Sequence, residues 1–438
     1  MTPTSPPPSP SGRPSGSPDT PRSHGSGATG SPGGSSQNGA PGRLPGLDPR
    51  QAGESGDPVE MTRVLVSIPS VNPDLSEGAA GEADVTRVCE DWLRSWGFRV
   101  EVVETTPGRP SLVARLGEGR PRTILNGHTD TVGVEGMTIA PFEPRVENGE
   151  LLGRGSCDMK AGLAAILAAA RRLATGNDPF PGELIVVFTA DEEFASIGLR
   201  DLLDRGLEAD RAVVTEPTSL ALCTANRGFT WIHVEVEGRA AHGSRPDLGR
   251  DAIRGAGRIL AELDGFEAEV QADHPLLAPT SIHAGTIKGG TAPPVYPAHC
   301  EMVLEARTLP GQTPDAVVEG VRAAVERARS ADPDLSARVR AGLSRPASEL
   351  DGDHPLVADL GAALRGEGRE PSLAGMSAWV ESAWFNEAGI PALCFGPGAI
   401  DRAHTADEAV PVEEIRVAAR VLERFVRGGV LPGDGFGG

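Results

Sequence analysis

The chain has 438 residues, of which 39% are hydrophobic and 23% charged, so it is long enough for two domains with a sizeable core. Its formal net charge of -20 at pH 7 repels nucleic acid and anionic lipid, which excludes both as expected partners. Five scattered cysteines without a C-x-x-C pair argue against disulfides or a thiolate zinc site and predict a reducing, cytoplasmic location. We find no apolar run long enough for a membrane span and no secretory signal.

The N-terminal segment, residues 1–53, is dominated by Pro, Gly and Ser. Such a segment buries too little apolar surface to offset its ordering entropy, so we expect a disordered tail. Beyond it, the sequence predicts helices at 57–67 and 81–96. The run MKAGLAAILAAARRLATG predicts a further helix at 159–174, with Gly176 as its stop.

Four short apolar runs predict buried strands, at 123–126, 184–189, 212–215 and 392–395. Strands that alternate with helices are typical of an α/β domain with a central, largely parallel sheet. We expect this domain to comprise residues 54–223 and 346–430.

The middle of the chain has a different order of elements. It predicts strands at 230–236, 281–287, 300–306 and 337–343, and helices at 249–263 and 314–328. The resulting β-α-β-β-α-β order is that of a ferredoxin-like unit. We therefore expect residues 224–345, called here the inserted unit, to interrupt the α/β domain.

Metal-binding residue types follow each of the four predicted buried strands. In chain order they are His128 with Asp130, the acidic run 191–193, Glu216, and His404. Because ligands bind beyond the carboxyl ends of strands in α/β folds, these side chains can converge on one crevice. Histidine and carboxylate ligands without thiolate suit Zn²⁺, with Co²⁺ or Mn²⁺ as substitutes. The excess of carboxylates indicates two ions bridged by one of them.

Each of these residues also has a purely structural interpretation. Asp158 could cap the helix that follows it, and Glu192 and Glu193 could be acids favoured at a helix N-terminus. Glu216 could be a turn residue, and the histidines could be ordinary loop residues. For any one residue the structural interpretation is preferred, but their joint occurrence at strand ends favours a metal site.

Seven segments together resemble a known family. They are GHTDTV, GRGSCDMKAG, TADEE, TEPT, AHGSRPDLGRDAI, EARTLPG and FGPGAIDRAHTADE. Through them, residues 58–426 resemble the dinuclear-zinc amidohydrolases that include acetylornithine deacetylase, succinyl-diaminopimelate desuccinylase, aminoacylase and carboxypeptidase G. The resemblance implies a zinc-peptidase-like catalytic domain, an inserted lid and dimerisation domain, and a homodimer.

The resemblance also implies which side chains hold two divalent ions, Zn²⁺ first and Co²⁺ as the alternative. His128, Asp158 and Glu216 would hold one ion, and Asp158, Glu193 and His404 would hold the other, with Asp158 as the bridge. A cis peptide would follow Asp158.

Four further roles are implied by the same matches. Asp130 would orient a ligand histidine, and Glu192 would be the general base that acts on water. His242 would reach the site of the partner subunit and stabilise the oxyanion, although by itself it is an ordinary turn histidine. Arg307 would bind a substrate carboxylate, although by itself it is a surface ion-pair residue.

Two stretches depart from the pattern of the family. Val380, Glu381 and Ser382 stand where relatives often have T-D-A, and GGTAPPVYP has Pro293 and Pro294 where relatives often have Asn after the glycines. Both stretches shape the substrate pocket in the family, so the departures weaken a specific assignment to acetylornithine or succinyl-diaminopimelate.

The sequence therefore predicts a metal-dependent amidohydrolase that acts on a small N-acyl amino acid. A carboxypeptidase or dipeptidase with the same residues is one alternative. A non-catalytic, metal-dependent binding protein is another, and Glu192 argues against it because a binding module has no use for a general base. The acyl group, the amino acid and the native metal stay open.

Overall fold

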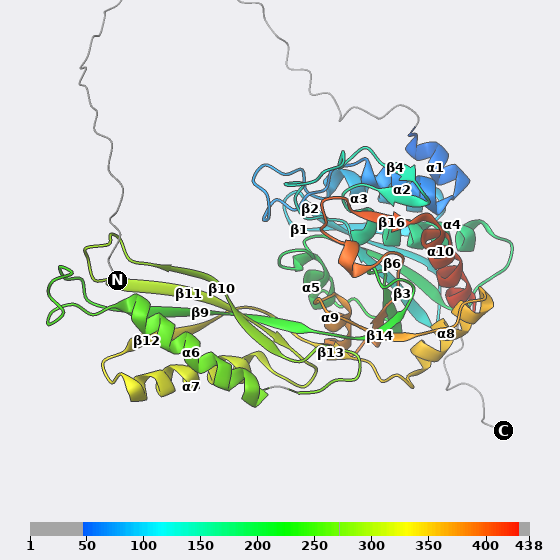
Figure 1. Ribbon diagram of the computed structural model, residues 1–438. Helices are drawn as coiled ribbons and strands as arrows, with labels where there is room; N and C mark the ends of the chain where they lie inside the picture. Colours follow the sequence, from blue (N-terminus) through cyan, green and yellow to red (C-terminus); the bar gives the residue numbers. More distant parts are fainter. Residues whose placement is uncertain (1–46, 271, 429–438) are drawn as a thin grey trace, which may run out of the picture. The chain divides into compact units, whose positions relative to one another are not determined.

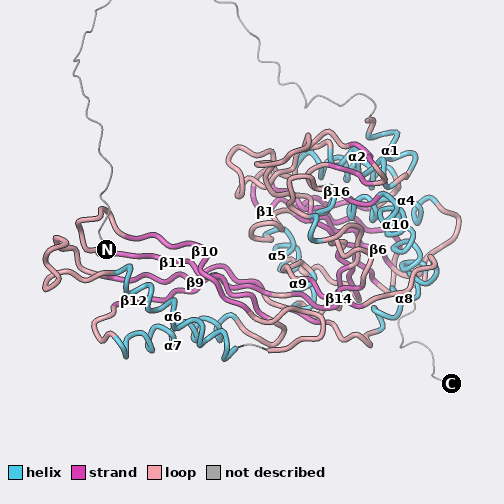
Figure 2. Tube along the Cα trace, in the orientation of Figure 1, coloured by secondary structure: helices cyan, strands magenta, loops and turns pink. Residues whose placement is uncertain are grey.

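The computed structural model describes residues 47–270 and 272–428 (Figures 1 and 2). Its first element is helix α1 (Pro49–Ser55), where the Asp48 side chain caps the N-terminus by accepting a hydrogen bond from the Arg50 amide at 2.9 Å. The indole of Trp92 donates to the Pro49 carbonyl oxygen at 2.7 Å. The prediction of a disordered tail that extends to residue 53 is therefore wrong for 49–53, and residues 1–46 lie outside the described residues.

The four predicted buried strands form the parallel centre of a nine-stranded sheet. In spatial order they are β6 (Glu183–Thr189), β3 (Arg122–His128), β7 (Arg211–Val214) and β15 (Ala392–Cys394). Antiparallel strands β2 (Arg109–Gly117) and β1 (Arg99–Thr106) extend one edge. Strands β8 (Leu222–Asn226), β13 (Ser348–Glu349) and β14 (Leu373–Met376) extend the other. The parallel centre confirms the predicted fold class.

Helices cover both faces of this sheet, which explains why the central strands read as continuous apolar runs. Side chains alternate between the faces, so Leu125 joins one core and its neighbour Ile124 joins the other. The first core contains residues of α2 (Pro58–Val66), α3 (Ala83–Ser95), α4 (Ala161–Thr175), α8 (Pro355–Gly366) and α10 (Val412–Arg427). The second contains residues of α5 (Ile197–Asp204) and α9 (Ser382–Glu387).

A small antiparallel sheet lies next to the turn that carries Asp158. Its strands, in order, are β16 (Ala409–Pro411), β5 (Glu150–Leu152) and β4 (Arg145–Glu147). Because β5 and β16 pair, the loop after β5 and the residue before β16 lie side by side. This pairing brings Glu408 to the turn that carries Asp158.

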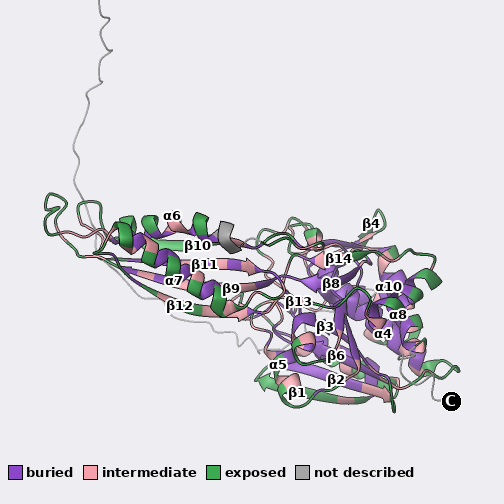
Figure 3. Ribbon diagram, turned by 90° about the horizontal axis from the view of Figure 1, so that it is seen from below, coloured by how far each residue is buried: buried purple, intermediate pink, exposed green. Residues whose placement is uncertain are grey.

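The inserted unit has the predicted β-α-β-β-α-β order. Its elements are β9 (Gly228–Glu237), α6 (Ala252–Val270), β10 (Ser281–Gly289), β11 (His299–Thr308), α7 (Pro314–Ala331) and β12 (Ser336–Arg345). The strands form an antiparallel sheet in the order β10-β11-β9-β12, and α6 and α7 cover one of its faces (Figure 3). Its buried side chains form a separate hydrophobic core. This supports our proposal of a distinct inserted domain, whose bounds stay a prediction.

No helix within the described ranges is both long and apolar enough to cross a membrane. All five cysteines are buried and free of disulfides.

Candidate metal centre

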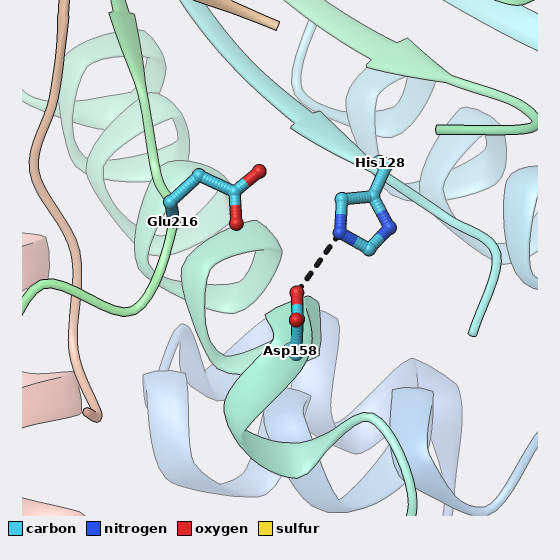
Figure 4. Close-up of side chains that lie close together, drawn as sticks. All are labelled: His128, Asp158 and Glu216. Carbon is cyan, nitrogen blue, oxygen red and sulfur yellow. Dashed lines mark hydrogen bonds and ion pairs between the residues drawn. The ribbon is translucent and has the colours of Figure 1, made fainter. Parts of the chain in front are cut away.

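Two of the predicted ligands meet at the end of the central sheet. His128 is the last residue of β3 and is 1% exposed. Its Nε2 lies 3.0 Å from Oδ1 of Asp158 (Figure 4). Its Nδ1 lies 3.0 Å from the carbonyl oxygen of Asp130. Since a carbonyl only accepts, Nδ1 carries the proton in a neutral ring, which leaves Nε2 free to bind a cation.

Asp158 lies in a kinked turn, η1 (Ser156–Lys160), that precedes α4. Asp158 and Met159 have non-helical backbone angles, so α4 begins at Ala161, two residues after the predicted start. The peptide bond between Asp158 and Met159 is cis, as the resemblance implied.

Glu216 completes the first group of predicted ligands. It follows β7 and is 3% exposed, and its carboxylate points toward His128 and Asp158 (Figure 4). One ligand atom from each of these three residues lies within 4.8 Å of the others. The Oε1 atom of Glu216 has no hydrogen-bond partner among the described residues, and an unpartnered buried carboxylate oxygen is suited to a cation.

The second group shares Asp158 with the first. His404 Nε2 lies 3.1 Å from the carboxylate of Glu193 and 3.4 Å from Oδ2 of Asp158. One ligand atom from each of these three residues again lies within 4.8 Å of the others. The two oxygens of Asp158 thus face two different groups, and this arrangement suits a carboxylate that bridges two ions.

Asp130 organises the acidic turn that follows β6. Its carboxylate accepts hydrogen bonds from the backbone amides of Glu192 and Glu193, both at 3.1 Å, and from Nδ2 of Asn72 at 2.8 Å. Its Oδ1 is 3.5 Å from Nδ1 of His128. One buried carboxylate therefore positions a predicted ligand histidine and both adjacent glutamates, a larger role than the resemblance implied.

Glu408 holds the turn that presents Asp158. Its carboxylate is fully buried and accepts from the amides of Gly155, Cys157 and Asp158 at 2.9–3.0 Å. It also forms an ion pair with Arg154 at 2.6 Å. The segment FGPGAIDRAHTADE contained Glu408, but nothing in the sequence indicated that its partners lie 250 residues earlier.

The charges in the site favour cations. Burial would lower the pKa of His404, but its contacts with Asp158 and Glu193 raise that pKa to about 11. Burial opposes ionisation of Asp158, yet its hydrogen bonds with the two histidines hold its pKa below the usual value. Burial raises the pKa of Glu216 well above the usual value, and the charge of Asp158 raises it further. Divalent cations would neutralise this excess of carboxylates.

Glu192 lies beside both groups without belonging to either. Burial raises its pKa well above the usual value; the electrostatic interaction with His128 opposes that shift, and the carboxylates of Glu216 and Glu193 add to it. A carboxylate whose proton affinity is raised is suited to accept and return a proton near neutral pH.

Glu381, which we had read only as a departure from the family pattern, belongs to the surroundings of the site. It is fully buried and accepts from Thr189 Oγ1 at 2.7 Å and from Ser196 Oγ at 3.0 Å. Burial raises its pKa to about 6. The stretch that lacks the T-D-A pattern therefore still supplies a carboxylate, and the sequence alone did not reveal that it contacts the end of β6.

Arg109 anchors the acidic turn from the side of β2. It is 5% exposed and contacts Glu82 at 2.7 Å, Asp74 at 2.7 Å and Asp191 at 3.0 Å. We did not identify this network from the sequence, because its members belong to four separate segments without a common motif.

The inserted unit carries the two remaining predicted residues. His242 is exposed, and its Nδ1 lies 2.8 Å from Ser244 Oγ. Arg307 forms an ion pair with Glu305 at 2.6 Å and lies over the ring of Phe229 at 5.4 Å. The structure thus brings the five predicted metal ligands together with Glu192 and Asp130. Among the described residues, His242 and Arg307 have partners only within the inserted unit.

The second departure from the family pattern lies next to His242. The amide of Gly243 donates to the carbonyl oxygen of Pro294 at 2.8 Å. Pro293 lines a pocket of about 680 Å³ together with residues of both segments, among them Gly243 and Tyr296. The two prolines therefore shape the surface around His242.

Known proteins share this fold and this sequence pattern. The chain is 34% identical to acetylornithine deacetylase of Myxococcus xanthus over 315 residues, 71% of this chain and 80% of that protein. A metallo-carboxypeptidase of the M20 family from Sulfolobus solfataricus has a TM-score of 0.72 at 17% identity, covering 85% of this chain and 98% of that one. A Bacillus subtilis protein described as a dinuclear metal binding peptidase of the M20 family has a TM-score of 0.66 at 18% identity, covering 86% and 98%.

A match to a family sequence profile assigns the chain to a protein family. The profile of Peptidase family M20/M25/M40 matches residues 124–428, which contain all five predicted ligands, Glu192 and the whole inserted unit. The chain belongs to Peptidase family M20/M25/M40.

Proposed function

We propose that this enzyme is a metal-dependent amidohydrolase that cleaves the amide bond of a small N-acyl amino acid. The observation that carries the proposal is the pair of ligand groups that share Asp158, with Glu192 beside them. The relatives named acetylornithine deacetylase support an N-acyl amino acid as the substrate class.

The donor set fits two divalent ions, which we propose to be Zn²⁺, with Co²⁺ as an effective substitute. His128, Asp158 and Glu216 would hold the first ion, and Asp158, Glu193 and His404 the second. When bound, the ions supply Lewis acidity toward the amide carbonyl and lower the pKa of water.

Glu192 is the proposed general base. It removes a proton from the attacking water and returns that proton to the nitrogen of the leaving amine. Asp130 fixes the backbone of Glu192 and Glu193 through their two amides, so it positions the base relative to the ligands. The ion pair of Glu408 with Arg154 and its three amide contacts keep Asp158 in place.

We also propose a homodimer joined through the inserted unit, in which His242 stabilises the oxyanion of the partner subunit's site. Strand β10 supports this proposal, because it is a nine-residue edge strand with mostly exposed side chains. Such an edge is a ready surface for pairing with a second copy. The five free cysteines agree with the proposed cytoplasmic location.

A hydrolysis screen tests the proposed function. N-acetyl, N-succinyl and N-formyl amino acids are compared with dipeptides and C-terminally extended peptides, using protein with a measured metal content. We expect turnover of N-acyl amino acids that is lost on chelation and restored by Zn²⁺ or Co²⁺. Turnover of peptides alone would make the enzyme a dipeptidase or carboxypeptidase. Metal binding without any turnover would identify a binding protein, and full activity in metal-free protein would refute metal dependence.

A further inference from the structure

A buried guanidinium without a carboxylate partner lies near the proposed general base. Arg345 is the last residue of β12 and is 3% exposed. Its guanidinium donates to the carbonyl oxygens of Ser344, at 2.9 Å, and of Ala195. It forms no ion pair within the part of the chain that the structure describes. A buried cation that has only neutral partners lowers the stability of the folded state, so we looked for a function that would explain it.

Two tryptophans and a second arginine surround this group. Arg345 lies 5.3 Å from the ring of Trp379 and 5.6 Å from that of Trp384, and the two rings meet edge-on at 5.8 Å. Arg200, an exposed residue of α5, lies 5.0 Å from the ring of Trp384. Among the described residues, Arg200 has no ion-pair partner either.

The tryptophans add unused hydrogen-bond donors. The Nε1 atoms of Trp379 and Trp384 are both buried and have no partner in the described ranges, and Trp379 is only 8% exposed. Indole nitrogens donate and do not accept. The four side chains therefore offer two guanidinium groups and two unpaired N–H groups, without an acid to match them.

Several contacts place this cluster beside the site. Ala195, whose carbonyl accepts from Arg345, lies two residues after the proposed ligand Glu193. Burial lowers the pKa of Arg345 and the charge of Arg200 lowers it further, while the negative charges of Glu192 and Asp191 oppose this shift. Arg345 is therefore close enough to Glu192 for their charges to interact.

Arg307, the residue first expected to bind a carboxylate, differs in this respect. Its charge is already neutralised by Glu305 at 2.6 Å, so a substrate carboxylate would have to compete with that partner. Arg345 has no such competitor, and its desolvation has already occurred in the folded protein. An arriving carboxylate would gain a charge-assisted hydrogen bond without any further desolvation of the guanidinium.

We propose that Arg345, assisted by Arg200 and by the indole N–H groups of Trp379 and Trp384, forms a subsite for one carboxylate of the substrate. The inference rests on the proposed function, because it assigns a specificity-determining residue to the N-acyl amino acid that the enzyme cleaves. The carboxylate can be the α-carboxylate, a side-chain carboxylate, or that of a dicarboxylic acyl group, and all three present the same chemistry.

A series of isosteric substrates distinguishes these sources. N-acetyl-L-glutamate carries both carboxylates, N-acetyl-L-glutamine only the α-carboxylate, and N-acetyl-L-isoglutamine only that of the side chain. N-succinyl-L-alanine and its succinamoyl counterpart test the acyl group. The variants are Arg345→Met, Arg345→Lys and Arg200→Met. Arg338→Met is the matched control, because Arg338 lies on the same strand, is 73% exposed and pairs with Glu237.

We expect wild-type kcat/KM to prefer one acid over its amide by about tenfold or more, as for a charge-assisted contact. Arg345→Met should abolish that preference while kcat/KM for the amide changes less than threefold. Arg345→Lys should retain part of the preference, Arg200→Met should reduce it, and Arg338→Met should keep it. The acid that the wild type prefers over its amide, and that Arg345→Met no longer prefers, identifies which carboxylate of the substrate binds.

Two outcomes would overturn the inference while leaving the proposed function intact. One is a wild-type enzyme that cleaves acids and amides equally. The other is an equal fall in kcat/KM for all substrates in Arg345→Met, together with an unchanged ratio of kcat/KM for acid and amide in Arg200→Met. That result would mean that Arg345 has only a structural role through its contact with Ala195. If the wild type hydrolyses none of these substrates, neither the acids nor their amide counterparts, the proposed function fails. The affinity for glutarate, measured by calorimetry, then tests the carboxylate subsite. Equal affinity in the wild type and in Arg345→Met would refute the subsite.

Discussion

Replacing Glu408 by Gln tests how the fold holds the proposed bridging ligand. One carboxylate oxygen accepts from Arg154 at 2.6 Å and from the Gly155 amide at 3.0 Å. The other accepts from the amides of Cys157 and Asp158 at 2.9 and 3.0 Å. Glutamine has the same shape but only one acceptor oxygen. Whichever way its amide is turned, two buried donors lose their acceptor.

The expected loss follows from these contacts. A buried donor left without an acceptor costs about 1–3 kcal/mol, so two of them cost about 2–6 kcal/mol. Both replacements remove the charge that pairs with Arg154, but Ala also leaves all four buried donors without an acceptor, which costs about 4–12 kcal/mol. That total approaches the whole stability of a typical domain, about 5–15 kcal/mol, so Glu408→Ala should not fold well and Glu408→Gln is the informative variant.

The assay is urea denaturation of the metal-free and metal-loaded forms, followed by a measurement of metal affinity. We expect the metal-free variant to lose about 2–6 kcal/mol. Metal affinity should fall about 10–100-fold, as for outer partners of ligands. Glu413→Gln is the control, because its side chain is 59% exposed, and it should change stability by less than about 0.5 kcal/mol. If Glu408→Gln matches the wild type in both measurements, the buried hydrogen bonds of Glu408 do not hold the turn of Asp158.

Four further predictions concern the site and its surroundings. Glu192→Gln should keep its metal, seen by elemental analysis, and lower kcat about 10²–10⁴-fold; loss of metal would make Glu192 a ligand. Inactive His242→Ala and Glu192→Gln proteins should regain activity when mixed, and no recovery despite proven subunit exchange would contradict a shared site. Arg307→Ala should keep most of its preference for an N-acyl amino acid over the carboxamide, because Glu305 already neutralises Arg307; loss of most of that preference would make Arg307 the residue that binds the carboxylate. The folded-state pKa of Glu381, about 6, lies above its usual value of 4.5, so this group stabilises the fold below pH 4.5 and that contribution is lost as the pH rises through 6. Relative to Glu381→Gln, the metal-free wild type should lose about 2 kcal/mol over this range, and parallel stability profiles would show that Glu381 is not shifted.

Local patterns in the sequence were sufficient to predict the four central strands, helices α2–α4 and the elements of the inserted unit, whereas the outer strands of the large sheet and helices α5 and α8–α10 were not predicted. The central strands are buried on both faces, so their apolar runs are continuous and easily recognised. The inserted unit has one covered face, and its β9 strand alternates between buried and partly exposed residues, which also gives a readable pattern. Boundaries that depend on a specific turn were predicted less well. The start of α4 was placed two residues early because the kinked turn at Asp158 has no local signature in the sequence.

The proximity of the predicted metal ligands could be foreseen because the ends of parallel strands meet at one edge of a sheet. His128 and Glu216 each follow a strand, so their convergence follows from the topology alone. Family resemblance then supplied the roles of the individual residues, including that of Asp158, which does not follow a central strand.

Only the tertiary structure revealed the groups that support these ligands. Glu408 reaches the amide of Asp158 across 250 residues of chain, and Glu381 reaches Thr189 across 192. Arg345 looks like an ordinary basic residue in the sequence, yet the fold buries it against two tryptophans beside the acidic turn. Burial and long-range hydrogen bonding depend on how distant segments pack, and they leave no local periodicity. The sequence by itself therefore determined which side chains are candidates for metal binding, whereas the packing decided what holds them in place and which buried charges lack an ion-pair partner among the described residues.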